Sequence, residues 1–288
     1  MSESRQGAAL DADLAAWIGR RSERHDAMDE RLIAEFTATL SPHLAQAAHV
    51  PPGLFWCLAP DIEPMDQLGG DGHPRLGLFL PDPTLPRRMW AGGELVFHDD
   101  FRPGDRVTKA STIEDIAFKT GKSGRLCFVT LRHHYSARGQ LILEERQDIV
   151  YREPPSATVG ARAAVPAEAA GPAPPGAGDW VVTPTPTLLF RYSAMTFNGH
   201  RIHYDFPYAT AVEGYSGLVV HGPLQATLML NLAAARLGRL PVRFAYRGLA
   251  PLMGDRAFSV MATAGSAGGL ETRVIDAAGE TTMAGRAA

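Results

Sequence analysis

The chain is poor in cysteine, with two among its 288 residues, and it contains no long apolar run. Cys57 and Cys127 lie far apart without partners at metal-ligand spacing, and their apolar neighbours predict buried, reduced thiols. No stretch approaches the roughly 18 apolar residues that a membrane-spanning helix needs. The polar N-terminus also lacks the apolar core of a signal peptide. We therefore expect a cytoplasmic protein without membrane contacts.

A strong charge of either sign is also missing, because the net charge is −3 and the isoelectric point about 6.4. This balance gives no general attraction to nucleic acid. There is no glycine-rich nucleotide fingerprint, so we expect no redox cofactor and no other separate cofactor. The hydrophobic content of 45% is enough for a sizeable packed core.

One segment stands apart in composition. Residues 154–178 contain six prolines, nine alanines and no aromatic residue, a composition that cannot build a core. We interpret this segment as a linker between an N-terminal half, residues 1–153, and a C-terminal half, residues 179–288.

The two halves share an order of predicted elements, with helices first and strands after them. In the N-terminal half the patterns predict helices at Asp11–Gly19 and Met28–Leu40, then a loop over about 59–92, then strands. These strands are expected at Glu94–His98, Arg106–Phe118, Arg125–Tyr135 and Leu141–Arg152.

In the C-terminal half, Val181–Arg191 is predicted to be extended and Pro223–Leu237 to be a buried helix ending at Gly238. Strands are expected at Arg243–Leu249, Ala257–Ala264 and Leu270–Asp276. An antiparallel sheet wrapped around a long helix is the hot-dog arrangement. The element order therefore predicts an α+β double hot-dog fold, with two such units in one chain.

The chemistry-bearing residues gather between the predicted extended segment and the buried helix. Three of the ten histidines, His200, His203 and His221, lie within this stretch, among glycines, aromatic residues and carboxylates. Polar and aromatic residues that lead into an apolar helix are typical of a site on a rigid scaffold.

A spaced set of residues runs through this segment, namely Asn198-x4-His203, Tyr204-Asp205, Tyr208-Ala209 and Val220-His221-Gly222. This spacing resembles the hydratase-2 motif of MaoC-like enoyl thioester hydratases. The exact residues are most similar to a branch that holds 3-methylfumaryl-CoA (mesaconyl-CoA) hydratases, itaconyl-CoA hydratases and type 2 hydroxyacyl-thioester dehydratases. The N-terminal half is similar to the same branch through Leu85–Asp105 and Asp148–Glu153.

The resemblance implies reversible hydration of an enoyl-CoA, and the residue types suit that reaction. His203 matches the family's catalytic histidine, and a histidine can take the proton of an attacking water. Gly222 precedes the predicted buried helix, where free N–H groups favour an oxyanion. The family's aspartate is Asn198 here; its amide can hold water but cannot act as a base. Compensation by Asp205 or Glu213 stays open.

Other residues have two readings each. Arg201 is a candidate for a CoA phosphate or a substrate carboxylate, and equally for a salt bridge within the loop. Tyr192 is a candidate for the acyl pocket or simply for the core. His221 is a candidate substrate contact, or pins the turn. His200 is as readily structural as functional, and Arg87 to Trp90 either border the CoA channel or are ordinary surface. His200, His203 and Asp205 have the side chains of metal ligands, but no HExxH helix or cysteine pair accompanies them, so we expect no metal.

We therefore predict a hydro-lyase acting on an acyl-CoA thioester, with a short branched dicarboxylic acyl group such as mesaconyl-CoA or itaconyl-CoA. The alternatives are a hot-dog acyl-CoA thioesterase and a non-catalytic subunit that binds acyl thioesters. We expect a homodimer or higher homo-oligomer.

Overall fold

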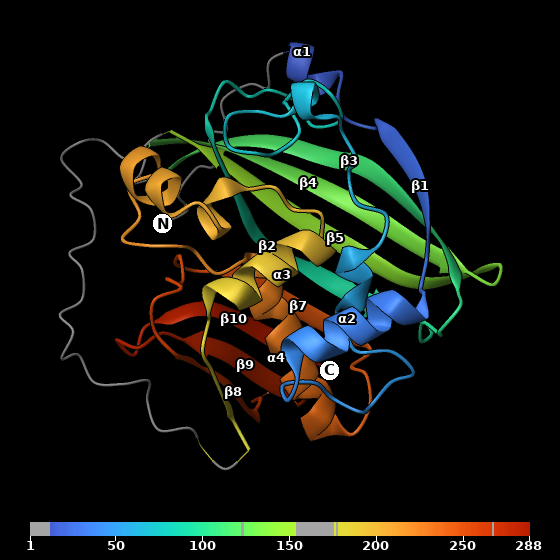
Figure 1. Cartoon of the computed structure of the whole chain (residues 1–288). Helices are drawn as coiled ribbons and strands as arrows, with labels where there is room; N and C mark the ends of the chain where they lie inside the picture. The colour runs from blue at the N-terminus through green and yellow to red at the C-terminus, as the bar shows by residue number, and fades with distance from the viewer. Residues whose placement is uncertain (1–11, 122–123, 154–175, 177, 267) are drawn as a thin grey trace, which may run out of the picture.

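The computed structural model describes residues 12–121, 124–153, 176, 178–266 and 268–288. The segment interpreted as a linker lies outside these residues, except for Gly176 and Gly178. Within them the chain forms one sheet of ten strands, with helices gathered on one side of it (Figure 1).

Every neighbouring pair of strands in this sheet is antiparallel, in the order β1-β3-β4-β5-β2-β7-β10-β9-β8-β6. The strands of the N-terminal half are therefore contiguous, and so are those of the C-terminal half. Their bounds are β1 Arg21–Ala27, β2 Arg87–Phe97, β3 Arg106–Gly121, β4 Gly124–Ala137, β5 Gln140–Arg152, β6 Trp180–Val182, β7 Arg243–Gly248, β8 Phe258–Ala264, β9 Leu270–Ile275 and β10 Thr281–Ala287.

The two halves meet where β2 pairs with β7, a junction that we call the seam. Gly92 and Gly93 of β2 face Arg247 and Tyr246 of β7 across it. A Cβ at Gly93 would lie 2.2 Å from the Arg146 carbonyl oxygen, and one at Gly92 would lie 2.7 Å from the Tyr246 carbonyl oxygen. Only glycine lets the strands approach this closely.

The longest helix, α4 (Gly222–Leu237), confirms the helix predicted at Pro223–Leu237. Proline stands in its first turn, and Gly238 follows it with φ 67°, the left-handed conformation that ends helices. Its side chains from Leu224 to Ala234 are buried. The helix packs against β8, β9 and β10 and also touches β2 and β7, so it spans the seam.

The helices of the N-terminal half are shorter. They are α1 (Ala12–Ala15), α2 (Glu30–Leu40) and two 3₁₀ turns, η1 (Leu54–Cys57) and η2 (Met65–Gln67). The Asp29 side chain caps α2 by accepting from the Leu32 N–H. Helix α2 packs mainly against α3 (Pro186–Met195), a helix of the other half, rather than against its own strands. The concave face of the N-terminal strands is therefore left for the cavity described below.

The prediction for Val181–Arg191 was wrong over most of its length. Only β6 is extended there, and helix α3 (Pro186–Met195) follows. Thr185 accepts a hydrogen bond from the Leu188 N–H, and Pro186 occupies the first helical turn. Proline in this place starts a helix rather than breaking one, which accounts for the error.

The strands predicted in both halves are present, with two additions. β1 and β10 were missed, and β2 begins at Arg87, seven residues before the predicted start at Glu94. β1 is polar, and it lies at the edge of the sheet, where pairing with β3 supplies the order that its sequence pattern does not show.

The main hydrophobic core runs through both halves. It joins Phe36, Phe55 and Tyr135 of the first half to α4 and the strands of the second. Both cysteines are buried free thiols, as predicted. Among the described residues, no helix is both long and apolar enough to cross a lipid bilayer.

Asn231 of α4 generates the first prediction, because it ties the two halves together. It is fully buried; its Oδ1 accepts from the Ala45 N–H at 3.1 Å, and its Nδ2 donates to the Pro52 carbonyl at 2.7 Å. Asn231→Ala leaves both backbone groups unpaired, so it should lower the free energy of unfolding by about 2–4 kcal/mol. Urea unfolding measures this; Ala235→Ser on the exposed face should cost less than about 0.5 kcal/mol. Equal effects of the two substitutions would contradict this role.

Candidate active site

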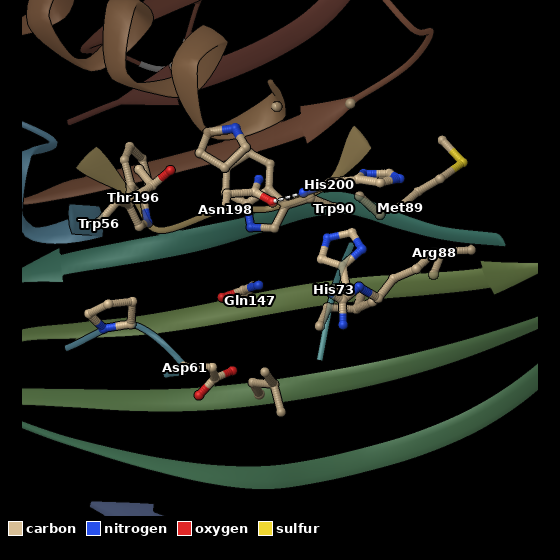
Figure 2. Close-up of a pocket in the computed structure, with 18 of the residues that line it drawn as sticks. Trp56, Asp61, His73, Arg88, Met89, Trp90, Gln147, Thr196, Asn198 and His200 are labelled. Carbon is tan, nitrogen blue, oxygen red and sulfur yellow. Dashed lines mark hydrogen bonds between the residues drawn. The ribbon is translucent and has the colours of Figure 1, made fainter. Parts of the chain in front are cut away.

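A cavity of about 520 Å³ lies between the two halves and is lined by both. This volume is within the range of pockets that hold small ligands. The β2 and β5 strands form one wall, and the segment after α3 forms the opposite wall (Figure 2). Labelled lining residues include Trp56, His73, Arg88, Gln147, Asn198 and His200.

His203 lines this cavity and lies in the 3₁₀ turn η3 (Arg201–His203). Its Nδ1 is 2.7 Å from the Val219 carbonyl oxygen. Because a carbonyl only accepts, Nδ1 carries the proton, and Nε2 is the nitrogen with a lone pair. Burial lowers the pKa of His203 to about 3, although the Val219 bond partly opposes this shift. The imidazole is therefore neutral and able to accept a proton.

His221 supports His203 from the side away from the cavity. The two rings are stacked, with centroids 3.6 Å apart. The His221 Nε2 is 2.8 Å from the Ser193 hydroxyl of α3, and the ring is almost fully buried. His221 is not among the lining residues. Its position is that of a residue that fixes the turn, and a direct substrate contact stays a prediction.

Asn198 is turned toward the cavity by the end of α3. Phe197 has φ 51°, and the N–H of Asn198 reaches back to the Ser193 carbonyl at 2.8 Å, which together close the helix. The Asn198 Oδ1 accepts from the His200 N–H at 3.0 Å, a bond drawn in Figure 2. This bond identifies the oxygen, so the amide presents its NH₂ group as a remaining donor.

Gly222 is the first residue of α4 and also lines the cavity. Within the described part of the chain, its N–H donates to no other residue. A Cβ at this position would lie 2.7 Å from the Cε3 atom of Trp90. The glycine therefore lets Trp90 of the N-terminal half close against the start of the helix, where free N–H groups and the helix dipole favour negative charge.

The other two predicted substrate contacts differ in position. Tyr192 lines the cavity, and its hydroxyl is 3.3 Å from that of Thr227. Arg201 does not line it. The Arg201 guanidinium donates to Asp205 from Nε and Nη2, and to the Gly70 carbonyl from Nη1. Of the two readings given for Arg201, the structure contains the salt bridge within the loop.

Neither carboxylate suggested as compensation for Asn198 lies in the cavity. Asp205 pairs with Arg201 and accepts from the Tyr208 N–H at 3.1 Å. Glu213 pairs with Arg87 at 3.3 Å. Both side chains are used in holding the loop together.

Sequence reasoning missed a pair of residues from the N-terminal half. Asp71 and His73 lie in the predicted loop, and the Asp71 Oδ2 is 2.8 Å from the His73 Nδ1. The His73 ring lies 4.2 Å from that of His200, whose ring is in turn 5.3 Å from that of His203. The signal in the sequence was an aspartate and a histidine that are separated by one glycine, Gly72, in this loop. No pattern in the sequence indicated that this loop would lie against the motif around His203.

This loop is held directly against the motif. The Asp71 carbonyl accepts from the Arg201 N–H at 2.9 Å, and a Cβ at Gly72 would lie 1.9 Å from the Gly199 carbonyl oxygen. Asp71, His73 and His200 are also close enough together to hold a metal ion. However, Asp71 already accepts from both the N–H and the ring of His73. These bonds hold the pKa of Asp71 below its ordinary value, although burial alone would raise it.

The chain matches the model of the family described as hydroxyacyl-thioester dehydratase type 2 over residues 54–254, a range that includes both walls of the cavity. It is 42% identical to a mesaconyl-C(4)-CoA hydratase of Chloroflexus aurantiacus over 87% of this chain and 89% of that protein. It is 30% identical to a mitochondrial hydroxyacyl-thioester dehydratase type 2 of Schizosaccharomyces pombe, over 78% and 84% of the two chains.

Solved structures resemble it in fold at low sequence identity. HtdX of Mycobacterium tuberculosis matches with a TM-score of 0.66 at 17% identity, over 93% of this chain and 98% of that one. A second protein of that organism, described as having a double hot-dog fold, matches with a TM-score of 0.52 at 16% identity over 94% and 95% of the two chains. The double hot-dog prediction is thereby confirmed. The chain belongs to the hydroxyacyl-thioester dehydratase type 2 family of MaoC-like hydratases.

Proposed function

We propose that this protein reversibly hydrates an enoyl-CoA to a 3-hydroxyacyl-CoA, and that its acyl group is a short branched dicarboxylic one such as mesaconyl. The observation that supports this type of reaction is the hydrogen bond of His203, in which the Val219 carbonyl keeps Nδ1 protonated. That bond leaves the unprotonated Nε2 for chemistry in a cavity that also holds Asn198 and the start of α4.

The proposed reaction has one proton carrier. The His203 Nε2 takes a proton from water as the water oxygen bonds to the β-carbon, and the π electrons move toward the α-carbon and the thioester oxygen. The Gly222 N–H, at the positive end of the helix dipole, stabilises the charge on that oxygen. The histidinium then returns the proton to the α-carbon, so that water has been added across the double bond.

Asn198 has a narrower part in this proposal than the aspartate of the wider family. With its Oδ1 bonded to the His200 N–H, it offers only N–H donors to the cavity. It can therefore position the water through the water's lone pairs but cannot remove a proton. No carboxylate of the motif replaces it, because Asp205 and Glu213 are paired with arginines.

The relative at 42% identity supports the choice of acyl group, because it is named a mesaconyl-C(4)-CoA hydratase. The cavity supports it too, since the cationic side chain of Arg88 lines it. The rival functions are separated by their products. A thioesterase releases free CoA, which a thiol reagent detects, whereas a binding subunit is stabilised by CoA esters without converting them.

We also propose a cytoplasmic location and a homo-oligomer. Burial raises the pKa of Cys57 to about 12 and that of Cys127 to about 11, which keeps both thiols protonated and unreactive. Such unpaired thiols are usual in a reducing compartment.

Replacing His203 tests the assignment of the base. His203→Gln should lower kcat for hydration by about 10²–10⁴-fold, the usual contribution of a general base, while CoA-ester binding changes little. Loss of the enoyl thioester's ultraviolet absorbance measures the rate, and circular dichroism checks the fold. His134→Gln, on the partly exposed β4 surface, is the matched control and should keep full activity. Full activity in the His203 variant would disprove the assignment.

The pH dependence tests the protonation state of the same residue. His203 is a base, and burial lowers its pKa to about 3, so it stays unprotonated until the pH falls close to that value. We therefore expect kcat/KM, which reports on the free enzyme, to vary by less than about twofold between about pH 8 and pH 5. An acid limb centred near pH ~6.5, the value of a solvated histidine, would contradict the buried neutral base.

A further inference from the structure

Arg88 of β2 is a cationic side chain of the cavity that the proposed reaction does not use. It lies opposite Tyr151 in the pairing of β2 with β5, and it lines the cavity between the two halves. In Figure 2 it extends toward His73, on the wall that faces Asn198 and His200. Burial lowers the pKa of both His73 and His200, and the positive charge of Arg88 adds to this lowering.

No carboxylate forms an ion pair with this guanidinium among the described residues, although the ionised Asp71 belongs to the same cluster. Among the described residues Arg88 forms no ion pair within 4.0 Å, whereas its neighbour Arg87 is paired with Glu213. The nearest carboxylate of the loop, Asp71, is bonded to His73. The side chains around Arg88, namely His73, His200 and Tyr151, are neutral, because burial lowers the pKa of the two histidines and raises that of Tyr151.

The other cations of the cavity have carboxylates near them or lie at its edge. Arg24 is 3.0 Å from Asp61. The Lys109 ammonium lies over the ring of Tyr135 at 5.4 Å and is under the influence of Glu145. Arg247 is exposed. Arg88 is thus the cavity cation beside His73 and His200, and among the described residues it has no ion-pair partner. A partly buried guanidinium in this position is ready to bind an anionic group bidentately.

The chemistry of the proposed substrate puts an anion at this place. In a four-carbon diacid bound through one end as a thioester, the free carboxylate is attached to the β-carbon, the atom that water attacks. It must therefore lie within about one bond length of the reacting atom, and hence beside His203. His203 is connected to the Arg88 side of the cavity by the ring contacts through His200 and His73.

We propose that Arg88 is a specificity-determining residue that binds the free carboxylate on the β-carbon of the acyl group. This inference rests on the proposed function and deepens it, because it restricts the substrates to enoyl-CoA esters that carry a β-carboxylate. Bound there, the carboxylate holds the β-carbon in front of His203 and neutralises the guanidinium. An acyl chain with a methyl group in that position leaves the buried cation unpaired, which disfavours its binding.

Two pairs of CoA esters test the proposal on the full chain. Mesaconyl-C4-CoA and 3-methylcrotonyl-CoA differ by a carboxylate against a methyl group on the β-carbon, and kcat/KM is measured for both. Succinyl-CoA and butyryl-CoA differ in the same way but have no double bond, so they serve as inhibitors that report on binding alone.

The wild-type protein should prefer mesaconyl-C4-CoA, and succinyl-CoA should inhibit it more tightly than butyryl-CoA. Arg88→Met should lower kcat/KM for mesaconyl-C4-CoA by about 10²-fold, the scale of a lost charged hydrogen-bonded contact, and that for 3-methylcrotonyl-CoA by less than about threefold. The preference for succinyl-CoA should disappear with it. Arg88→Lys keeps the positive charge but cannot donate two parallel hydrogen bonds to a carboxylate. It should therefore retain part of the preference for mesaconyl-C4-CoA.

Lys109→Met is the matched control, because it removes another cation of the same cavity and should leave both preferences in place. Equal loss for both substrates in Arg88→Met, or loss of the preferences in Lys109→Met instead, would overturn the role of Arg88. A wild-type protein that hydrates both substrates equally well would also overturn it while leaving the proposed function intact. A wild-type protein that hydrates neither would instead reject the proposed function.

Discussion

The seam between β2 and β7 is the constraint on which the site depends. Two glycines lie at it: a Cβ at Gly92 would overlap the Tyr246 carbonyl oxygen of β7, and one at Gly93 would overlap the Tyr246 hydroxyl and the Arg146 carbonyl oxygen of β5. The residues just before them on β2 therefore lie against the other half. Trp90 closes against Gly222 at the start of α4, and Arg88 enters the wall of the cavity. Neither half has both the motif and this wall.

The unequal helices of the two halves explain where the cavity is. Helix α4 fills the space beside the C-terminal strands, whereas α2 packs against α3 and leaves the concave face of the N-terminal strands uncovered by a long helix. The freed volume is lined by polar groups such as Lys109 and His133 together with Trp56. In the proposed reaction, the C-terminal half supplies the proton chemistry, and the N-terminal half supplies room for the acyl group and the Arg88 guanidinium.

Burial gives the histidine cluster its electrostatic character. His200, His203 and His221 are all less than a tenth exposed, and each has a lowered pKa because the protein interior disfavours the imidazolium. Neutral rings can stack closely, as those of His203 and His221 do, without charge repulsion. In the proposal, an anionic group bound near Arg88 meets a guanidinium that has no ion-pair partner among the described residues, whereas the ionised Asp71 is bonded to His73.

The sequence by itself determined the local features: the buried helix after Gly222, the long strands of both halves, and the motif that identifies His203. These follow from periodicity, capping residues and spacing over a few residues, which act within one segment. The prediction failed where one local signal had two meanings, as at Thr185-Pro186, where proline begins a helix. It also failed where order comes from a neighbour, as for β1 at the sheet edge.

Only the tertiary structure decided which distant residues share the cavity. Asp71, His73 and Arg88 are more than a hundred positions from the motif, and no periodicity connects them to it. Arg201, attractive from the sequence because it lies within the motif, is bound by Asp205, four residues away on the same short segment. Arg88, for which the sequence left the CoA channel and ordinary surface equally open, lines the cavity near the histidines. Long-range pairing of strands sets these positions, and a sequence pattern records only near neighbours.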